Sequence, residues 1–122
     1  MKIRLFGDSI RLRLTQLEVE ALAGGGAIES VTPFCDEALA CIIQPSENVF
    51  EARHATGRIT VMVPLDQVKA WAASSEVGMY TEQPSAGLVL RVAVEKDFRC
   101  IHQPDAPDNA GTFPNPAAST GD

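Results

Sequence analysis

The sequence predicts an α+β fold in which two short helices pack on a mostly antiparallel, curved or barrel-like sheet made of two ββαββ pseudo-repeats. Short stretches alternate between apolar and polar residues, two segments carry helix-start signals, and the two halves of the chain resemble each other. Residues 9–28 read as a strand, a helix, a glycine stop and the start of a further strand, and the same plan returns from Arg58 to Val77.

Residues 1–14 are expected to form a β-hairpin with its turn at Gly7-Asp8. A two-residue loop predicts four cross-strand pairs: Leu5 with Ile10, Ile3 with Leu12, Arg4 with Arg11 and Lys2 with Arg13. The last two pairs place like charges opposite each other, which destabilises a strand pair. We therefore expect Glu29, Glu51 or Glu95 to offset them.

The first helix is predicted over Thr15–Ala23. Thr15 and Glu18 have the capping-box spacing, in which each side chain satisfies a backbone amide at the helix start. Gly24-Gly25-Gly26 ends this helix, because glycine reaches left-handed backbone conformations without a clash. A second helix is predicted over Leu65–Ala73, after Pro64, a residue suited to a helix start.

The remaining strands are expected at residues 27–34, 38–44, 49–54 and 58–63, near residues 79–80, and at residues 88–95. Turns are predicted at 45–48, 55–57 and 83–87. Trp71 and Tyr80 are predicted to lie in the core. The order of the strands is left open.

A shift of 49 positions superimposes the apolar positions of the two halves without a gap, so that Ile10 falls on Ile59 and Leu12 on Val61. We interpret this as an internal duplication with pseudo-repeats at 1–48 and 49–100. The alternative is that the two units resemble each other without a duplication, because the same physical constraints act on both. Residues 1–101 are then a single domain, followed by a tail at 102–122.

The tail is distinguished by its proline content. Half of the eight prolines fall in the last 21 residues, and regular structure is not expected there. Phe113-Pro114-Asn115-Pro116 is the exception, because an aromatic side chain between stiff residues suits docking on the body. Whether the tail is ordered is left open.

Composition limits the class of protein. Of the 122 residues, 45% are apolar and 21% charged, which is ordinary for a globular protein. No apolar run has the 18 or so residues of a membrane span, and the start is strand-like, so we expect a cytoplasmic protein without a membrane partner. The net charge of −6 argues against non-specific nucleic-acid binding, and we expect no nucleic-acid partner.

Several motifs together resemble a family of small bacterial proteins of unknown function. They are the opening Met-Lys-Ile-Arg, the stretch Ser9–Thr15 with Glu18-Val19-Glu20, the stretch Val94–Cys100, and the closing Phe113-Pro114-Asn115-Pro116. The resemblance covers nearly the whole chain and implies a stand-alone bacterial protein. It implies no activity, and no functional residue can be transferred from it.

The basic cluster Lys2, Arg4, Arg11 and Arg13 is the strongest candidate site, and it gives residues 1–14 a net charge of +3. Guanidinium groups bind carboxylate or phosphate bidentately, so cations on adjacent strands suit an anion. If the sheet curls, this face lines a groove or tunnel, as in enzymes that hold polyphosphate between basic strands; this is an analogy of fold only. The alternative is a solvated face balanced by glutamates.

Metal and catalytic sites are not expected. Cys100, His102, Asp105 and Asp108 match no zinc spacing, and the proline-rich backbone is a poor preformed site. Only His54 and His102 could act as an imidazole base, and no nucleophile motif accompanies them. The three cysteines, Cys35, Cys41 and Cys100, are interpreted as reduced and mostly buried. We expect no cofactor.

The sequence thus favours a small binding or interaction module over an enzyme, without deciding between them. The alternative is a binder or enzyme for a phosphorylated or other anionic small molecule that uses the N-terminal hairpin. A third hypothesis is a homo-oligomer whose strand edges pair between subunits. A protein partner, a second copy of the chain and a small anion are the partners that the sequence leaves open.

Overall fold

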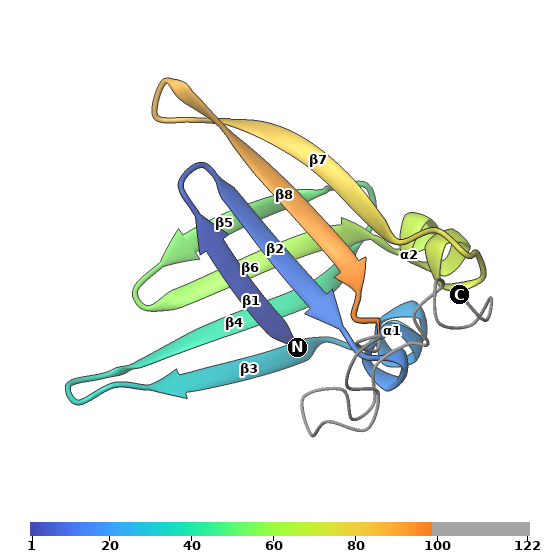
Figure 1. Cartoon of the computed structure of the whole chain (residues 1–122), viewed down its shortest axis with the longest axis horizontal. Coiled ribbons are helices and arrows are strands. Elements are labelled where there is room, and N and C mark those ends of the chain that lie inside the picture. The colour runs from blue at the N-terminus through green and yellow to red at the C-terminus, as the bar shows by residue number, and fades with distance from the viewer. Residues whose placement is uncertain (99–122) are drawn as a thin grey trace, which may run out of the picture.

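The computed structural model describes residues 1–98. Within them the chain forms eight strands and two helices (Figure 1): β1 (Lys2–Phe6), β2 (Ser9–Leu14), α1 (Gln16–Ala23), β3 (Ile28–Pro33), β4 (Ala38–Ser46), β5 (Glu51–Ala55), β6 (Arg58–Pro64), α2 (Leu65–Ala72), β7 (Gly78–Ser85) and β8 (Leu88–Lys96). The residues of the predicted tail, 102–122, and Cys100 lie outside this described part.

The strands form two four-stranded sheets, which we name sheet A (order β1-β2-β8-β7) and sheet B (order β3-β4-β6-β5). The prediction of an α+β fold with mostly antiparallel strands is confirmed, because each sheet has two antiparallel pairs around one central parallel pair. The prediction of a single curved or barrel-like sheet is wrong. Each helix carries the chain from one sheet to the other, so each half contributes one hairpin to each sheet.

The core fills the space between the two sheets. Alternate residues of β2, β6 and β8 point into it, among them Leu12, Val61 and Val94, none of which is exposed to solvent. The helices lie side by side at one end of the sheets and cover that end of the core (Figure 1) with Val19 and Leu22 from α1 and Val68 and Trp71 from α2.

Local predictions agree closely with the structure. The first hairpin has the predicted register, including Arg4 opposite Arg11 and Lys2 opposite Arg13. The Thr15 side chain accepts a hydrogen bond from the Glu18 amide, and the Glu18 carboxylate accepts one from the Thr15 amide, which is the predicted capping box. Glu18 also binds the amino terminus at 2.7 Å.

Two predicted turns, 45–48 and 83–87, are shorter than expected, because the preceding strands extend into them. β4 continues through Pro45, and β7 continues through Pro84. Proline is tolerated at both places because no partner strand needs its missing amide hydrogen. On the β3 side, Pro45 lies beyond Ile28, where β3 begins. Pro84 lies on β7, an edge strand of sheet A. The turn between β7 and β8 is reduced to Ala86-Gly87, both with positive φ.

The ungapped superposition of the two halves does not continue through the whole repeat. In the central parallel pairs, Leu12 faces Val94 in sheet A and Val61 faces Ile43 in sheet B. Leu12 and Val61 are 49 positions apart, whereas Ile43 and Val94 are 51 apart. Their partners Ile28 and Met79 are also 51 positions apart, so the alignment needs a gap of two residues between each helix and the strand that follows it. The duplication and the domain boundaries stay predictions.

The last strand is fastened to the second helix through Lys96, which points inward and is 6% exposed. Its ammonium group donates a hydrogen bond of 2.6 Å to the Ser74 carbonyl and lies 5.6 Å from the centre of the Trp71 ring. Burial lowers the pKa of Lys96, while the nearby Glu76 acts in the opposite direction. This contact closes the helical end of the molecule.

Candidate functional site

The outward side chains of sheet A form a surface that we call the basic face. The strand register arranges them in three rows across β1, β2, β8 and β7. The rows are Lys2, Arg13, Glu95 and Gly78; Arg4, Arg11, Ala93 and Tyr80; and Phe6, Ser9, Arg91 and Glu82. Five basic side chains and two carboxylates therefore share one face of a chain whose net charge is −6. The four predicted basic residues are brought together, and Arg91 joins them.

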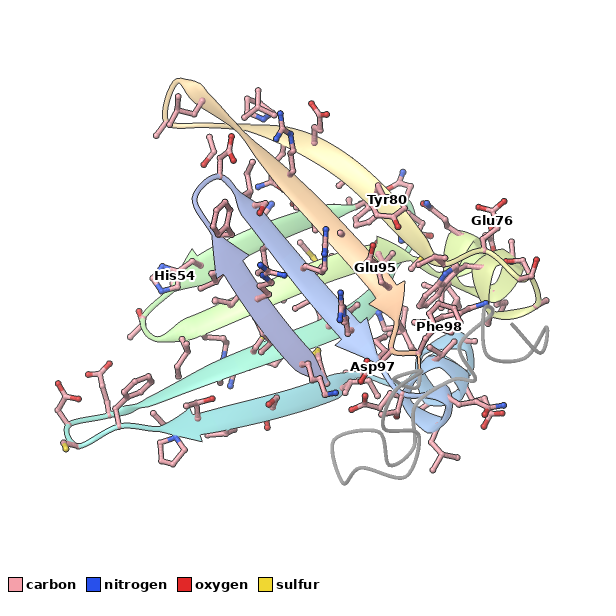
Figure 2. The ribbon with its side chains drawn as sticks, in the orientation of Figure 1. His54, Glu76, Tyr80, Glu95, Asp97 and Phe98 are labelled. Carbon is pink, nitrogen blue, oxygen red and sulfur yellow. The ribbon has the colours of Figure 1, made fainter. Side chains whose placement is uncertain are left out.

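Glu95 contacts three other side chains of this face. Its carboxylate is largely buried and lies 3.3 Å from Arg11 Nε and 3.9 Å from Arg13 Nε. It also accepts a 2.7 Å hydrogen bond from the Tyr80 hydroxyl, and Figure 2 shows the two side chains meeting across β7 and β8. Partial burial and this hydrogen bond raise the pKa of Tyr80. The prediction that Glu95 offsets the opposed cations is confirmed.

Glu29 and Glu51, the other predicted counter-charges, lie on sheet B. Glu51 is 2.8 Å from Arg53, and Glu29 is 3.8 Å from Arg58. On the basic face the second counter-charge is Asp97, which directly follows β8 and is 4% exposed. Its carboxylate lies 3.0 Å from Lys2 Nζ. The sequence pattern missed Asp97 because it lies past the end of the alternating strand.

Arg4 and Arg91 are the basic residues of this face that form no ion pair: among residues 1–98, neither has a carboxylate within 4.0 Å. Arg4 directly faces Arg11, and Arg91 faces Glu82, which also lines the cleft described next. Arg4 and Arg91 are both exposed. Like charges that face each other on neighbouring strands, such as Arg4 and Arg11, repel each other. An anion bound between these two side chains reduces this repulsion.

The shape of the basic face also supports an anion site at this position. Ala93 has a small side chain between Arg11 and Tyr80, and a shallow cleft of about 430 Å³ opens there, lined also by Ser9 and Arg91. A smaller hollow of about 170 Å³ lies on the other side of Ser9 and Arg11 and reaches Arg4 and Phe6. The two hollows share Ser9 and Arg11, so they flank one pair of side chains on β2.

The groove or tunnel considered for a curled sheet does not enclose the basic residues, because the interior of the molecule is an apolar core and these residues point outward. Tyr80 was also expected in the core, but it is 57% exposed. Its neighbour Met79 is the buried residue, since successive side chains of a strand point to opposite faces. Trp71 is buried as predicted, at 4%.

The remaining candidates do not form a reactive cluster in the described residues. Cys35 is exposed and Cys41 is buried, both as free thiols. In residues 1–98 no three His, Cys, Asp or Glu side chains gather closely enough to hold a metal ion. His54 lies on β5, on the sheet opposite the basic face (Figure 2). Cys100, His102, Asp105 and Asp108, whose spacing argues against a zinc site, lie outside the described part.

The comparisons with known proteins agree with the resemblance drawn from the motifs. The model of a family of unknown function (DUF7009) matches residues 1–117. No curated protein and no solved structure has significant similarity to the chain. Among the described residues, no helix is long and apolar enough to cross a membrane.

Proposed function

We propose that this chain, which belongs to the family of unknown function DUF7009, is a small binding module that holds a multiply charged anion on the basic face of sheet A. Arg4, Arg11 and Arg91 are the direct ligands, and Lys2 and Arg13 supply the surrounding positive potential. The observation that carries this proposal is the pair of exposed arginines, Arg4 and Arg91, that form no ion pair within 4.0 Å among residues 1–98.

The spacing of these groups favours an extended ligand. Arg4 and Arg91 lie two strands apart, so their backbones are on the order of 10 Å from each other. Long arginine side chains can reach across this distance, with Ser9 and Arg11 between them. A di- or triphosphate, or a dicarboxylate, can contact both ends, whereas a single small anion contacts only one.

The direct test is thermal unfolding of the protein with and without inorganic triphosphate. A ligand that binds only the native state raises the melting temperature. Replacing both Arg4 and Arg91 by Gln removes two charge-assisted contacts, each worth about 1.5–3 kcal/mol, so affinity should fall roughly a hundredfold or more. Added salt should weaken binding to the unmodified protein as well.

The matched control is the double variant Arg53→Gln with Arg58→Gln. These arginines occupy the outward surface of sheet B but are paired with Glu51 and Glu29. Triphosphate should bind this variant as it binds the unmodified chain. Equal binding by the Arg4→Gln, Arg91→Gln variant would place the anion elsewhere.

A second copy of the chain is the competing partner. The outer edges of β1 and β3 carry no neighbouring strand in the described part, and Val31 and Phe34 of the β3–β4 hairpin are 54% and 60% exposed. Free strand edges pair readily with other chains. Sedimentation over a range of concentrations tests this: a dimer that Val31→Lys dissociates favours strand pairing, whereas a monomer at all concentrations excludes it.

We also propose that the two halves of the chain arose by duplication. What supports this is the strand order: exchanging the halves converts β1-β2-β8-β7 into β5-β6-β4-β3, which is the order of sheet B. On this proposal the basic face is a specialisation of one sheet, to which each half contributes a hairpin. Arg4 and Arg53 then occupy equivalent positions, and only Arg53 retains a carboxylate partner.

A further inference from the structure

A second concave surface lies between the two sheets, at the end away from the helices. The hairpin turns gather at this end, and no helix covers it (Figure 1). A cleft of about 550 Å³ opens here, within the size range of small-molecule sites. It is lined by Leu5, Ile10, Leu39, Ala52, Arg53, His54, Ile59, Gln83, Ser85 and Leu90.

The floor and walls of this cleft are apolar and come from both sheets. Ile10 and Ile59 are buried at its base, and Leu39 and Leu90 are half-buried on its walls. Leu5 stands at the rim and is 62% exposed, although its side chain lies on the inward face of β1. Leaving such aliphatic surface in water is unfavourable, and a ligand with an apolar body would cover it.

The polar groups of the cleft are few, and none of them is acidic. Among the described residues, the ionisable ones that line it are His54 and Arg53, whose side chain points to the outward surface of sheet B. Arg53 already binds Glu51, at 2.8 and 2.9 Å from its two nitrogens. The Gln83 amide is occupied by the backbone of Ala52. His54 and Ser85 therefore remain to bind a ligand.

We propose that this cleft binds an amphipathic carboxylate of the fatty-acid type. The apolar chain lies between the sheets against Ile10, Leu39 and Leu90, and the carboxylate accepts hydrogen bonds from His54 and Ser85 at the mouth. A concave cavity with an apolar floor, no acidic lining residue and two hydrogen-bonding side chains at its mouth fits this ligand better than it fits a flat protein surface. The site is separate from the basic face and does not depend on it.

Calorimetric titration with decanoate below its micelle concentration tests the proposal. Decanoate should bind, whereas acetate, which lacks the tail, and decyltrimethylammonium, which has the opposite charge, should not. His54→Gln should weaken decanoate binding about tenfold. Leu5→Glu should weaken it more, because it brings a negative charge to the rim at an exposed position that folding tolerates.

Leu17→Glu is the matched control, since Leu17 is 73% exposed on α1 at the other end of the molecule. It should bind decanoate like the unmodified chain. The proposal is overturned if decanoate does not bind, if the cationic amphiphile binds equally well, or if Leu5→Glu has no effect. It is also overturned if sedimentation reveals a dimer that Leu5→Glu dissociates, because a second copy would then cover the cleft.

Discussion

Gly78 determines how closely Tyr80 and Glu95 can approach each other on the basic face. Gly78 faces Glu95 across the strand pair, and the space above it is filled by its neighbours. A Cβ atom at this position would lie 2.7 Å from the Val94 carbonyl oxygen, 2.8 Å from Glu95 Cγ and 2.9 Å from the Tyr80 hydroxyl. The absence of a side chain is therefore what lets Tyr80 reach the Glu95 carboxylate.

Gly78→Ala should lower the free energy of unfolding by roughly 1–3 kcal/mol, because the clash involves backbone and cannot be relieved by a side-chain rotation alone. It should also separate Tyr80 from Glu95, so that the pKa of Tyr80 falls toward its ordinary value. Tyr80 is the only tyrosine, so tyrosinate absorbance follows it directly. The control is Gly24→Ala, whose Cβ would meet nothing closer than 3.4 Å. An unchanged Tyr80 titration in Gly78→Ala would contradict this account.

Cys41 is a core residue whose thiol influences stability at high pH. It is 1% exposed, and burial raises its pKa from 9.0 to about 11. The unfolded chain releases the thiol proton above pH 9 while the folded chain keeps it. The stability that this proton provides is complete below pH 9 and is lost as pH rises toward 11, by on the order of 2 kcal/mol.

Cys41→Ala removes this dependence along with some core packing. The difference in unfolding free energy between the unmodified chain and Cys41→Ala should therefore be larger at pH 8 than at about pH 10.5. Urea titrations at the two pH values measure it. Cys35→Ser, at an exposed position, should show no such change. A difference that grows with pH would contradict the assignment to Cys41.

At the scale of elements, the side-chain amide of Gln83 links an edge strand of each sheet. The Gln83 side chain on β7 donates to the Ala52 carbonyl and accepts from the Ala52 amide on β5, both at 2.8 Å. It therefore acts as a short substitute for strand pairing between an edge of sheet A and an edge of sheet B. The same contact forms one side of the apolar cleft.

Gln83→Met keeps the length of the side chain but leaves both Ala52 groups without their partner. The expected loss is about 1–3 kcal/mol of unfolding free energy, with faster hydrogen exchange at the Ala52 amide. Gln83→Glu, which keeps only the acceptor, should protect that amide better than Gln83→Met does. Gln67→Met, at an exposed position on α2, is the control. Unaltered exchange at Ala52 in Gln83→Met would show that the amide does not couple the sheets.

The elements also show which parts of the fold the sequence could predict. Hairpin register and helix capping were predicted correctly because both are set by neighbours a few residues apart, as at Thr15 and Glu18. The parallel pairing of β2 with β8 joins residues such as Leu12 and Val94, which are far apart in the sequence. Alternation says which face a residue occupies but not which strand lies beside it. The division into two sheets was therefore not predictable.

The same limit explains the gaps in the predicted site. Arg91 alternates with buried Val92 on the last strand, so its outward direction could be read from the sequence. Its position opposite Ser9 could not be predicted, because it depends on the pairing of β2 with β8. The apolar cleft was missed for a similar reason. His54 and Leu39 come from different strands of sheet B, and they meet Leu5 only when the two sheets face each other.

At the scale of the whole molecule, charge is sorted between the two sheets. The chain carries a net charge of −6, yet sheet A presents five basic side chains on one surface. On sheet B, both outward arginines, Arg53 and Arg58, have a carboxylate partner. The helices close one end of the core, and the apolar cleft occupies the other. This distribution gives the molecule two distinct surfaces suited to ligands.

The most direct test of the central claim follows the arginine side-chain Nε–Hε signals by NMR while inorganic triphosphate is added. The account predicts that the signals of Arg4 and Arg91 move most, that Arg11 follows, and that Arg53 and Arg58 stay in place. Raising the salt concentration should reverse the changes, as expected for exposed charges. Larger movements at Arg53 and Arg58 than at Arg4 and Arg91, or no movement at any arginine, would contradict the claim that sheet A carries the anion site.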